Sequence, residues 1–133
     1  ICRIAKHADH ITLYNIDACE LVSNLKDTLP QNTLFYFDPP YYVKGKELYI
    51  NYYNDLDHIA IANQVSSLER QKWIITYDNV KYIRKLYTNY RQIKYSLAYT
   101  ANKITKGEEI MILSDNVFVS PLKPITILAR HLK

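Results

Sequence analysis

The sequence predicts an α/β protein with an open, mainly parallel sheet that ends in an antiparallel hairpin. Strand-like and helix-like segments alternate along the chain in the order β-α-β-α-β-α-β-β, and such alternation places helices on both faces of a sheet. The length of 133 residues suits one hydrophobic core and leaves no room for a second full domain. The composition, 48% hydrophobic and 23% charged residues, is typical of a folded chain.

The first part of the chain predicts two strands with a helix between them. Residues 11–16 alternate between apolar and polar side chains, as a half-buried strand does. Asp17 then caps a helix that runs through Leu25 and ends near Pro30. Residues 33–37 form a short apolar run, rich in aromatics and bounded by prolines, which predicts a strand buried on both faces of a parallel sheet.

Helix and strand alternate again after a long loop from residue 38 to about residue 54. A helix starts at Asp55 or Asp57, and residues 72–77 form the next apolar strand. Asp78 or Asn79 caps the third helix. The residues expected on one face of the helix after the loop are Ile59, Ala62, Val65, Ser66 and Leu68, with Ile61 beside them.

The last strands predict a hairpin at one edge of the sheet. Residues 91–99 alternate clearly between the two faces. A polar loop around residues 103–107 separates them from an apolar strand at residues 109–114. Residues 125–128 have the pattern of one more strand.

The composition limits the classes of function. Gly45 and Gly107 are the only glycines, which excludes a glycine-rich phosphate or dinucleotide loop within this chain. The net charge of +4 mildly favours a polyanionic partner. Cys2 and Cys19 are interpreted as reduced thiols, and no Cys/His cluster has the spacing of a zinc site, so no metal is expected. No membrane span or leader is recognised, and we expect a cytoplasmic protein.

The candidate site lies where strands end, because ligands of open α/β sheets bind outside the carboxyl ends of the strands. Asp17, Asp38 and Asp78 each follow a predicted strand. Asp38 also opens the segment DPPY, in which two prolines make the turn rigid. A carboxylate and a proline carbonyl are then held close together, and both are hydrogen-bond acceptors.

Two adjacent acceptors match an exocyclic amine, which carries two N–H donors on one nitrogen. Accepting both bonds draws that nitrogen out of conjugation with its ring, so its lone pair can attack an electrophile. The ring of Tyr41 suits stacking on a flat base. The alternative is a proline turn that only ends a strand, with Asp38 bonded to local backbone.

Residues 35–42 (FYFDPPYY) resemble motif IV of the Dam-like (D12 class) DNA adenine N6-methyltransferases. The likeness covers roughly residues 11–116. It implies a partial Rossmann-like, S-adenosylmethionine-dependent methyltransferase fold. The other segments that carry the likeness are Leu48-Tyr49, Tyr52-Tyr53, Asp57-His58, residues 75–79, Ile83, Leu86-Tyr87, residues 95–99 and residues 108–114.

The resemblance implies methyl transfer from S-adenosylmethionine to N6 of a flipped-out adenine in double-stranded DNA. By the same resemblance, the Asp38 side chain and the Pro39 carbonyl accept the adenine amine, and Tyr41 stacks on the base. Asp17 matches the family's acidic position that binds the adenine amine of the cofactor. Ala18 stands where the family usually has a phenylalanine near that ring, so this half of the pocket is expected to be weaker.

Two parts of the family pattern are missing from the chain, the Phe-x-Gly-x-Gly-like cofactor loop and the upstream target-recognition region. In the family's sheet, two further strands separate the strand before Asp17 from the strand before Asp38. Residues 1–133 are therefore expected to be the C-terminal part of a catalytic domain, with an exposed strand edge. The expected partners are DNA and the missing N-terminal half or a complementing chain.

The loop after the motif carries the candidate DNA contacts, which are Lys44, Lys46, Tyr49, Tyr52 and Tyr53. The lysines either contact phosphate or form a solvated pair, and the tyrosines either contact DNA or cover the pocket. Two other functions stay open. One is a non-catalytic truncated remnant that binds DNA or a partner chain, and the other is methyl transfer to cytosine N4, RNA or a protein amide.

Overall fold

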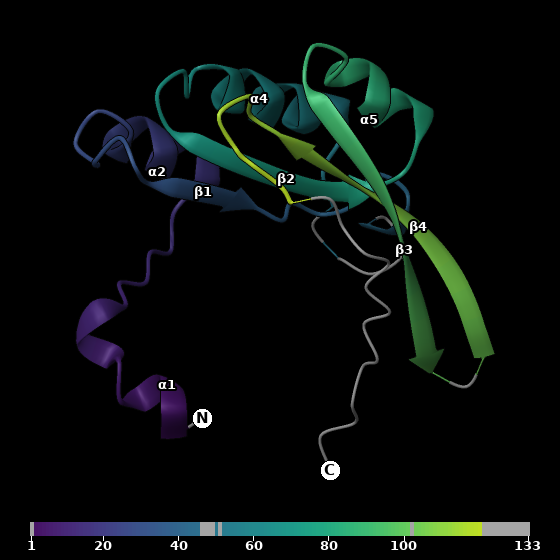
Figure 1. The fold of residues 1–133 in the computed structure, drawn as a ribbon, viewed down its shortest axis with the longest axis horizontal. Coiled ribbons are helices and arrows are strands. Elements are labelled where there is room, and N and C mark those ends of the chain that lie inside the picture. Colours follow the sequence, from purple (N-terminus) through teal and green to yellow (C-terminus); the bar gives the residue numbers. More distant parts are fainter. Residues whose placement is uncertain (1, 46–49, 51, 102, 121–133) are drawn as a thin grey trace.

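A computed structural model describes residues 2–45, 50, 52–101 and 103–120 and contains one four-stranded sheet (Figure 1). The strands are β1 (Leu34–Phe37), β2 (Lys72–Asp78), β3 (Arg91–Ala101) and β4 (Lys103–Leu113), in the spatial order β1-β2-β4-β3. β1 and β2 pair in parallel, whereas β4 pairs antiparallel with both β2 and β3. The α/β class and the C-terminal hairpin are confirmed. The mainly parallel sheet is wrong for the described residues, because only one of the three pairings is parallel.

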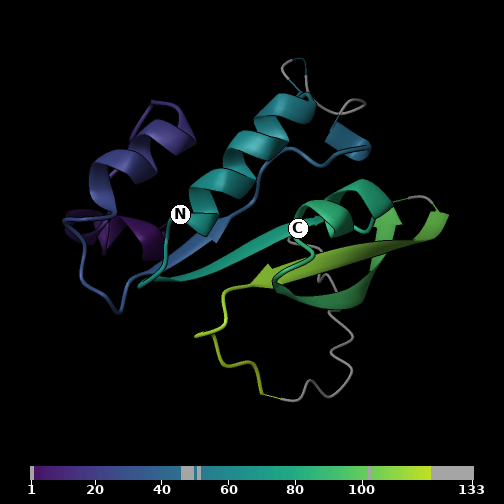
Figure 2. The same ribbon diagram turned by 90° about the horizontal axis from the view of Figure 1, so that it is seen from above.

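The helices that pack on this sheet lie on one face of it, as Figures 1 and 2 show. They are α2 (Ala18–Leu25), α4 (Asp55–Ser66) and α5 (Lys81–Leu86). The short α1 (Cys2–Ala5) and the 3-10 helix η1 (Ala8–His10) lie away from the sheet in Figure 1 and add no residue to its core. The expectation of helices on both faces is therefore wrong for the part of the chain that the structure describes.

The core lies between the three helices and the facing side of the sheet. Alternate residues of β2 point to opposite faces, so Trp73, Ile75 and Tyr77 face the helices while Thr76 and Asp78 face away. The core residues from the other elements are Val22, Phe37, Ile61, Ala62, Val65, Leu68, Ile83, Tyr87, Ile110 and Ile112. Of the five residues predicted to line one face of this helix, Ala62, Val65 and Leu68 are buried, and so is Ile61 beside them.

The inner face of α4 is turned slightly from the predicted one. His58 is completely buried, and its Nδ1 lies 3.1 Å from the hydroxyl of Tyr77, whereas Ile59 is 37% exposed and Ser66 is exposed. Because β2 offers a hydroxyl beneath this helix turn, a polar side chain takes the inward position. The predicted inward positions of Ile59 and Ser66 are therefore wrong.

Of the three helices that pack on the sheet, two have a side-chain cap at their N-terminus. Asp17 caps α2 as predicted, since its carboxylate accepts hydrogen bonds from the amides of Cys19 and Glu20. α4 begins at Asp55, and Asn54 caps it in a capping box with Asp57. α5 has Val80 at its cap position and no side-chain cap, so the predicted capping role of Asp78 or Asn79 is wrong.

Two predicted strands differ from the structure at the open edge of the sheet. Residues 11–16 form no strand, because no described strand lies beside them to complete a hydrogen-bonded ladder. β1 is not buried on both faces, since Leu34 and Tyr36 are 53% and 61% exposed on the side that no described helix covers. Leu13 is 90% exposed.

The hairpin is longer than predicted, because β4 already begins at Lys103 and the expected polar loop at 103–107 is part of the strand. The predicted strand at 125–128, together with Lys46 and Tyr49, lies outside the described residues. Cys19 is a free thiol. Among the described residues, no helix is long and apolar enough to cross a membrane.

Candidate active site at the carboxyl ends of β1 and β2

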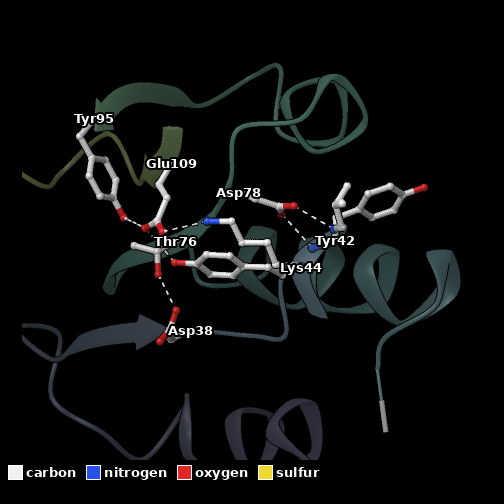
Figure 3. A network of polar contacts seen from close by, with 9 residues as sticks. Asp38, Tyr42, Lys44, Thr76, Asp78, Tyr95 and Glu109 are labelled. Carbon is white, nitrogen blue, oxygen red and sulfur yellow. Dashed lines mark hydrogen bonds and ion pairs between the residues drawn. The ribbon is translucent and has the colours of Figure 1, made fainter. Parts of the chain in front are cut away.

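The site lies at the carboxyl ends of the two parallel strands, on the face of the sheet away from the helices (Figure 3). Phe37 pairs with Ile75, so the next residue, Asp38, comes beside Thr76. Across the antiparallel pairs, Asp78 lies opposite Glu109, and Glu109 lies opposite Tyr95. The sheet register therefore brings side chains from all four strands together around the Asp38-Pro39-Pro40-Tyr41 turn.

A chain of hydroxyl groups orients the Asp38 carboxylate. The Thr76 hydroxyl donates a hydrogen bond to Oδ1 of Asp38 at 2.8 Å, and the Tyr36 hydroxyl lies 3.2 Å from Oγ1 of Thr76. A threonine hydroxyl has one proton, and Thr76 donates it to Asp38, so Tyr36 is the donor in the second bond. This chain engages one carboxylate oxygen, and the exposed side chain of Asp38 can still accept through Oδ2.

Tyr41 is held by a carboxylate from the hairpin. Its hydroxyl donates to Oε2 of Glu109 at 2.9 Å, and the Tyr95 hydroxyl donates to the same oxygen at 2.9 Å. Lys44 lies with its Nζ 3.9 Å from Oε1 of Glu109 and 5.8 Å from the centre of the Tyr41 ring. Burial raises the pKa of the Tyr41 phenol far above its usual value, and the hydrogen bond to Glu109 raises that pKa further.

Asp78 fixes the backbone of the turn. Its two carboxylate oxygens accept hydrogen bonds from the backbone amides of Tyr42 and Val43, both at 2.8 Å, and Asp78 is only 4% exposed. The ring of Tyr42 stacks on the ring of Tyr82, with 4.7 Å between the ring centres. A charged anchor thus ties the turn after β1 to the end of β2, and an aromatic contact ties it to α5.

Gly45 packs closely against the Asp38-Pro39-Pro40-Tyr41 turn. Its amide donates to the Tyr41 carbonyl at 2.8 Å, and a Cβ atom at this position would stand 3.3 Å from both the carbonyl carbon and the Cβ of Pro40. Only a residue without a side chain fits this approach without moving Pro40.

If the turn carries the reaction that is proposed below, replacing Gly45 by alanine is expected to lower its rate about threefold to tenfold, since displaced catalytic groups lose rate steeply with distance. The added methyl group has to push Pro40 away by a few tenths of an ångström, and Pro40 belongs to the rigid turn that aims Asp38. Thermal unfolding and initial rates of transfer measure the two effects separately. A variant with full activity would show that the turn tolerates this shift.

Asp17 lies at the N-terminus of α2, beside the N-terminal end of α4. The Ser23 hydroxyl bonds to Gln64 and the Lys26 amine to Ser67, so α2 and α4 run side by side in the same direction with their N-termini at one end. Burial raises the pKa of the Cys19 thiol, and the charges of Asp17 and Asp57 raise it further.

Tyr53 belongs to the neighbourhood of Asp17 as well. Burial raises the pKa of the Tyr53 phenol, and the charge of Asp17 adds to this rise. Oδ1 of Asp17 accepts from the amides of Cys19 and Glu20, and its exposed carboxylate can accept further donors. Ala18 is also exposed.

The structure places the predicted site residues in two groups. The first group is the turn itself, with Asp38, Pro39 and Tyr41, together with Lys44, whose amine points to Glu109. Asp17 and Ala18 start α2, near Tyr53, which is half-buried against His58. Tyr52 is 52% exposed, and its predicted DNA contact stays a prediction.

Sequence reasoning placed Asp78 at the end of a strand but assigned no supporting role in the turn to Asp78, Thr76, Glu109 or Gly45. Two signals pointed toward them. Asp78 directly follows a predicted apolar strand, and Glu109 begins the next one with a charge that is only 1% exposed in the fold. Within the described part of the chain, no group of three or more His, Cys, Asp or Glu side chains could hold a metal ion.

Comparison with known protein families gives a match over most of the chain. The sequence model of the family described as D12 class N6 adenine-specific DNA methyltransferase matches residues 3–102, which is most of the chain and includes Asp17, Asp38 and Asp78. A search of curated proteins gives no match.

Proposed function

The chain belongs to the D12 class N6 adenine-specific DNA methyltransferase family, and from this premise we propose that it carries the target-adenine part of a site-specific DNA adenine methyltransferase. The observation that carries the proposal is the orientation of Asp38 at the end of β1, where Thr76 engages Oδ1. A substrate amine can then donate one N–H to Oδ2 of Asp38 and the other to the Pro39 carbonyl. The proposal extends the family assignment to the chemistry of this chain's own residues.

The proposed role of the turn is to make the adenine N6 nucleophilic. Two acceptors on one nitrogen pull its hydrogens out of the ring plane, and the nitrogen lone pair leaves conjugation with the ring. S-adenosylmethionine carries its methyl group on a sulfonium, which makes that methyl electrophilic. The nitrogen–methyl bond forms as the sulfur–methyl bond breaks, and the methylated amine then loses a proton to Asp38 or to water.

Asp17 is the residue of this chain proposed to hold the cofactor. The donor chemistry fits one end of S-adenosylmethionine, because the exposed carboxylate at the start of α2 can accept the amine of the cofactor's adenine. Ala18 leaves room beside that ring but offers little surface to pack on it. The methionine end needs donors of the kind a glycine-rich loop supplies, and the chain has only two glycines.

Asp17 substitutions separate capping from cofactor binding. Alanine is expected to lower the free energy of unfolding by about 1 kcal/mol because the cap is lost, whereas asparagine caps a helix as well as aspartate does. Both variants are expected to bind S-adenosylmethionine more weakly than the wild type. Urea unfolding and calorimetric titration with S-adenosylmethionine, on the complete product of the gene, measure the two effects. An asparagine variant with unchanged affinity would remove Asp17 from the cofactor site.

The exposed side chains of the edge strand β1 favour a protein partner in addition to DNA. Leu34 and Tyr36 on β1 are largely exposed, and so are the apolar side chains of residues 11–16. A polypeptide that carries the glycine-rich loop, either the N-terminal half of the same domain or a complementing chain, would cover these side chains. On this proposal residues 1–133 form the C-terminal part of the catalytic domain.

The experiment that tests the function is incorporation of labelled methyl groups into DNA. Unmethylated bacteriophage DNA and S-adenosylmethionine with a labelled methyl group are mixed with the 133-residue chain and, separately, with the complete gene product. Transfer by the complete product is expected, with little or none by the chain alone. Absence of transfer by the complete product would support the alternative of a non-catalytic remnant.

A further inference from the structure

Glu109 is a buried carboxylate that joins the hairpin to the proposed base-binding turn. It lies on β4 with 1% of its surface exposed, and its Oε2 accepts hydrogen bonds from both Tyr41 and Tyr95 (Figure 3). The Tyr41 contact joins residues 68 positions apart in the sequence. Burying a charged carboxylate is costly unless it is paired and hydrogen-bonded, so a fold keeps one where its contacts serve a purpose.

The contacts of Glu109 restrict how the Tyr41 ring can move. The turn fixes the backbone of Tyr41, and the bond from its hydroxyl to Glu109 fixes the far end of the ring. The Glu109 carboxylate is itself held by two side chains. The Tyr95 hydroxyl donates to Oε2 at 2.9 Å, and Nζ of Lys44 lies 3.9 Å from Oε1. Both ends of the Tyr41 side chain lie on the long axis of its ring, so the bond to Glu109 fixes the direction of that axis. Because a phenol O–H prefers to lie in the plane of its ring, the bond also favours one orientation of the ring plane, and a flat base can stack only on a ring that presents its face in the right direction.

We propose that Glu109 is a positioning residue that holds the ring of Tyr41 at the angle needed to stack on the target base. Tyr95 supports Glu109 from β3 in the same arrangement. This inference rests on the proposed function, because it assigns Glu109 a role in the same site. Glu109 itself touches neither the amine nor the cofactor in this scheme and acts only through Tyr41.

The electrostatics of Tyr41 agree with this arrangement. Burial contributes most to the raised pKa of its phenol, followed by the hydrogen bond to Glu109 and the charge of Glu109, and then by Tyr95 and Asp38. A neutral phenol is required to donate the bond. Removing the charge of Glu109 is therefore expected to lower the pKa of Tyr41 toward its ordinary value.

The first test is a double-mutant cycle on the complete gene product with unmethylated bacteriophage DNA. Glu109→Gln and Tyr41→Phe are each expected to lower kcat/KM about tenfold to a hundredfold, because either change frees the ring. The double variant is expected to match Tyr41→Phe alone, since the hydroxyl of residue 41 through which Glu109 acts on the site is then absent. Effects that multiply in the double variant would overturn the proposal. Glu108→Gln is the matched control, since Glu108 is exposed and bonds to Asn79 outside the turn, and it should retain normal activity.

The second test needs no activity and uses the 133-residue chain with tyrosines labelled with ¹³C at Cζ. The Tyr41 resonance, assigned as the one that Tyr41→Phe removes, is expected to change its chemical shift at neutral pH in Glu109→Gln, because the carboxylate that accepts the hydroxyl proton is lost. An unchanged chemical shift would overturn the Glu109–Tyr41 contact. If this shift is found while the wild-type gene product transfers no methyl groups, the contact stands and the proposed function is the part that fails.

Discussion

Replacing Asp38 by alanine is expected to lower methyl transfer by about a thousandfold or more while leaving the fold intact, by analogy with the loss of a preorganised polar group at other active sites. The side chain is exposed, and its hydrogen bond in the structure comes from the Thr76 hydroxyl. Losing one exposed contact costs about 1 kcal/mol of folding free energy at most. The loss in rate has a different cause, because the substrate amine keeps only the Pro39 carbonyl as an acceptor and its lone pair stays conjugated.

Asparagine at position 38 is the matched control. It keeps the size of the side chain and one acceptor oxygen but loses the charge, so its activity is expected to fall between those of the wild type and the alanine variant. Initial rates with labelled S-adenosylmethionine and thermal unfolding of each variant are the measurements. Near-normal transfer by Asp38→Ala would contradict the proposed role of the carboxylate, and so would a loss of activity explained entirely by unfolding.

Replacing Asp78 by alanine is expected to weaken both the fold and the reaction. The carboxylate accepts two backbone hydrogen bonds, from Tyr42 and Val43, and it is buried. Hydrogen bonds to a charged group contribute about 1.5–3 kcal/mol each, and the two are not independent, so we expect a loss of about 3 kcal/mol in the free energy of unfolding. The Asp38-Pro39-Pro40-Tyr41 turn then loses its anchor, and transfer is expected to fall about a hundredfold as the acceptors move.

The control variants for Asp78 separate the anchor from the charge. Asparagine has one acceptor oxygen and turns an NH₂ group toward the second amide, so its stability is expected to lie between the wild type and the alanine variant. Asp27→Ala removes an exposed carboxylate after α2 and should change little. Urea unfolding and transfer rates at a temperature where every variant is folded are the measurements. A stable Asp78→Ala protein with normal transfer would show that the turn does not depend on this anchor.

Features fixed by short stretches of sequence could be predicted. The cap at Asp17 and the strands β2 and β3 depend on patterns among neighbouring residues, and the structure confirms all three. The position of the DPPY turn at the end of a strand is of the same kind. These predictions succeed because hydrogen bonding and side-chain periodicity within a segment decide them.

Features that depend on distant parts of the chain could not be predicted. Residues 11–16 have a strand pattern but lack a neighbouring strand among the described residues, and no pattern within the segment reveals that. Asp78 looks like a helix cap, yet its carboxylate bonds to amides 35 and 36 residues earlier in the chain. The residues that support the site, such as Asp78, act through long-range contacts of this kind, whereas the proposed reacting groups belong to the local motif at residues 38–41.

Analysis of the methylated nucleosides tests the central claim most directly. Unmethylated DNA is treated with the complete gene product and S-adenosylmethionine, digested to nucleosides and examined by mass spectrometry. The arrangement of Asp38, Pro39 and Tyr41 predicts N6-methyldeoxyadenosine, and it predicts that Asp38→Ala abolishes the product. Methyl groups found instead on cytosine N4, or no methylated nucleoside with the wild-type protein, would contradict the account.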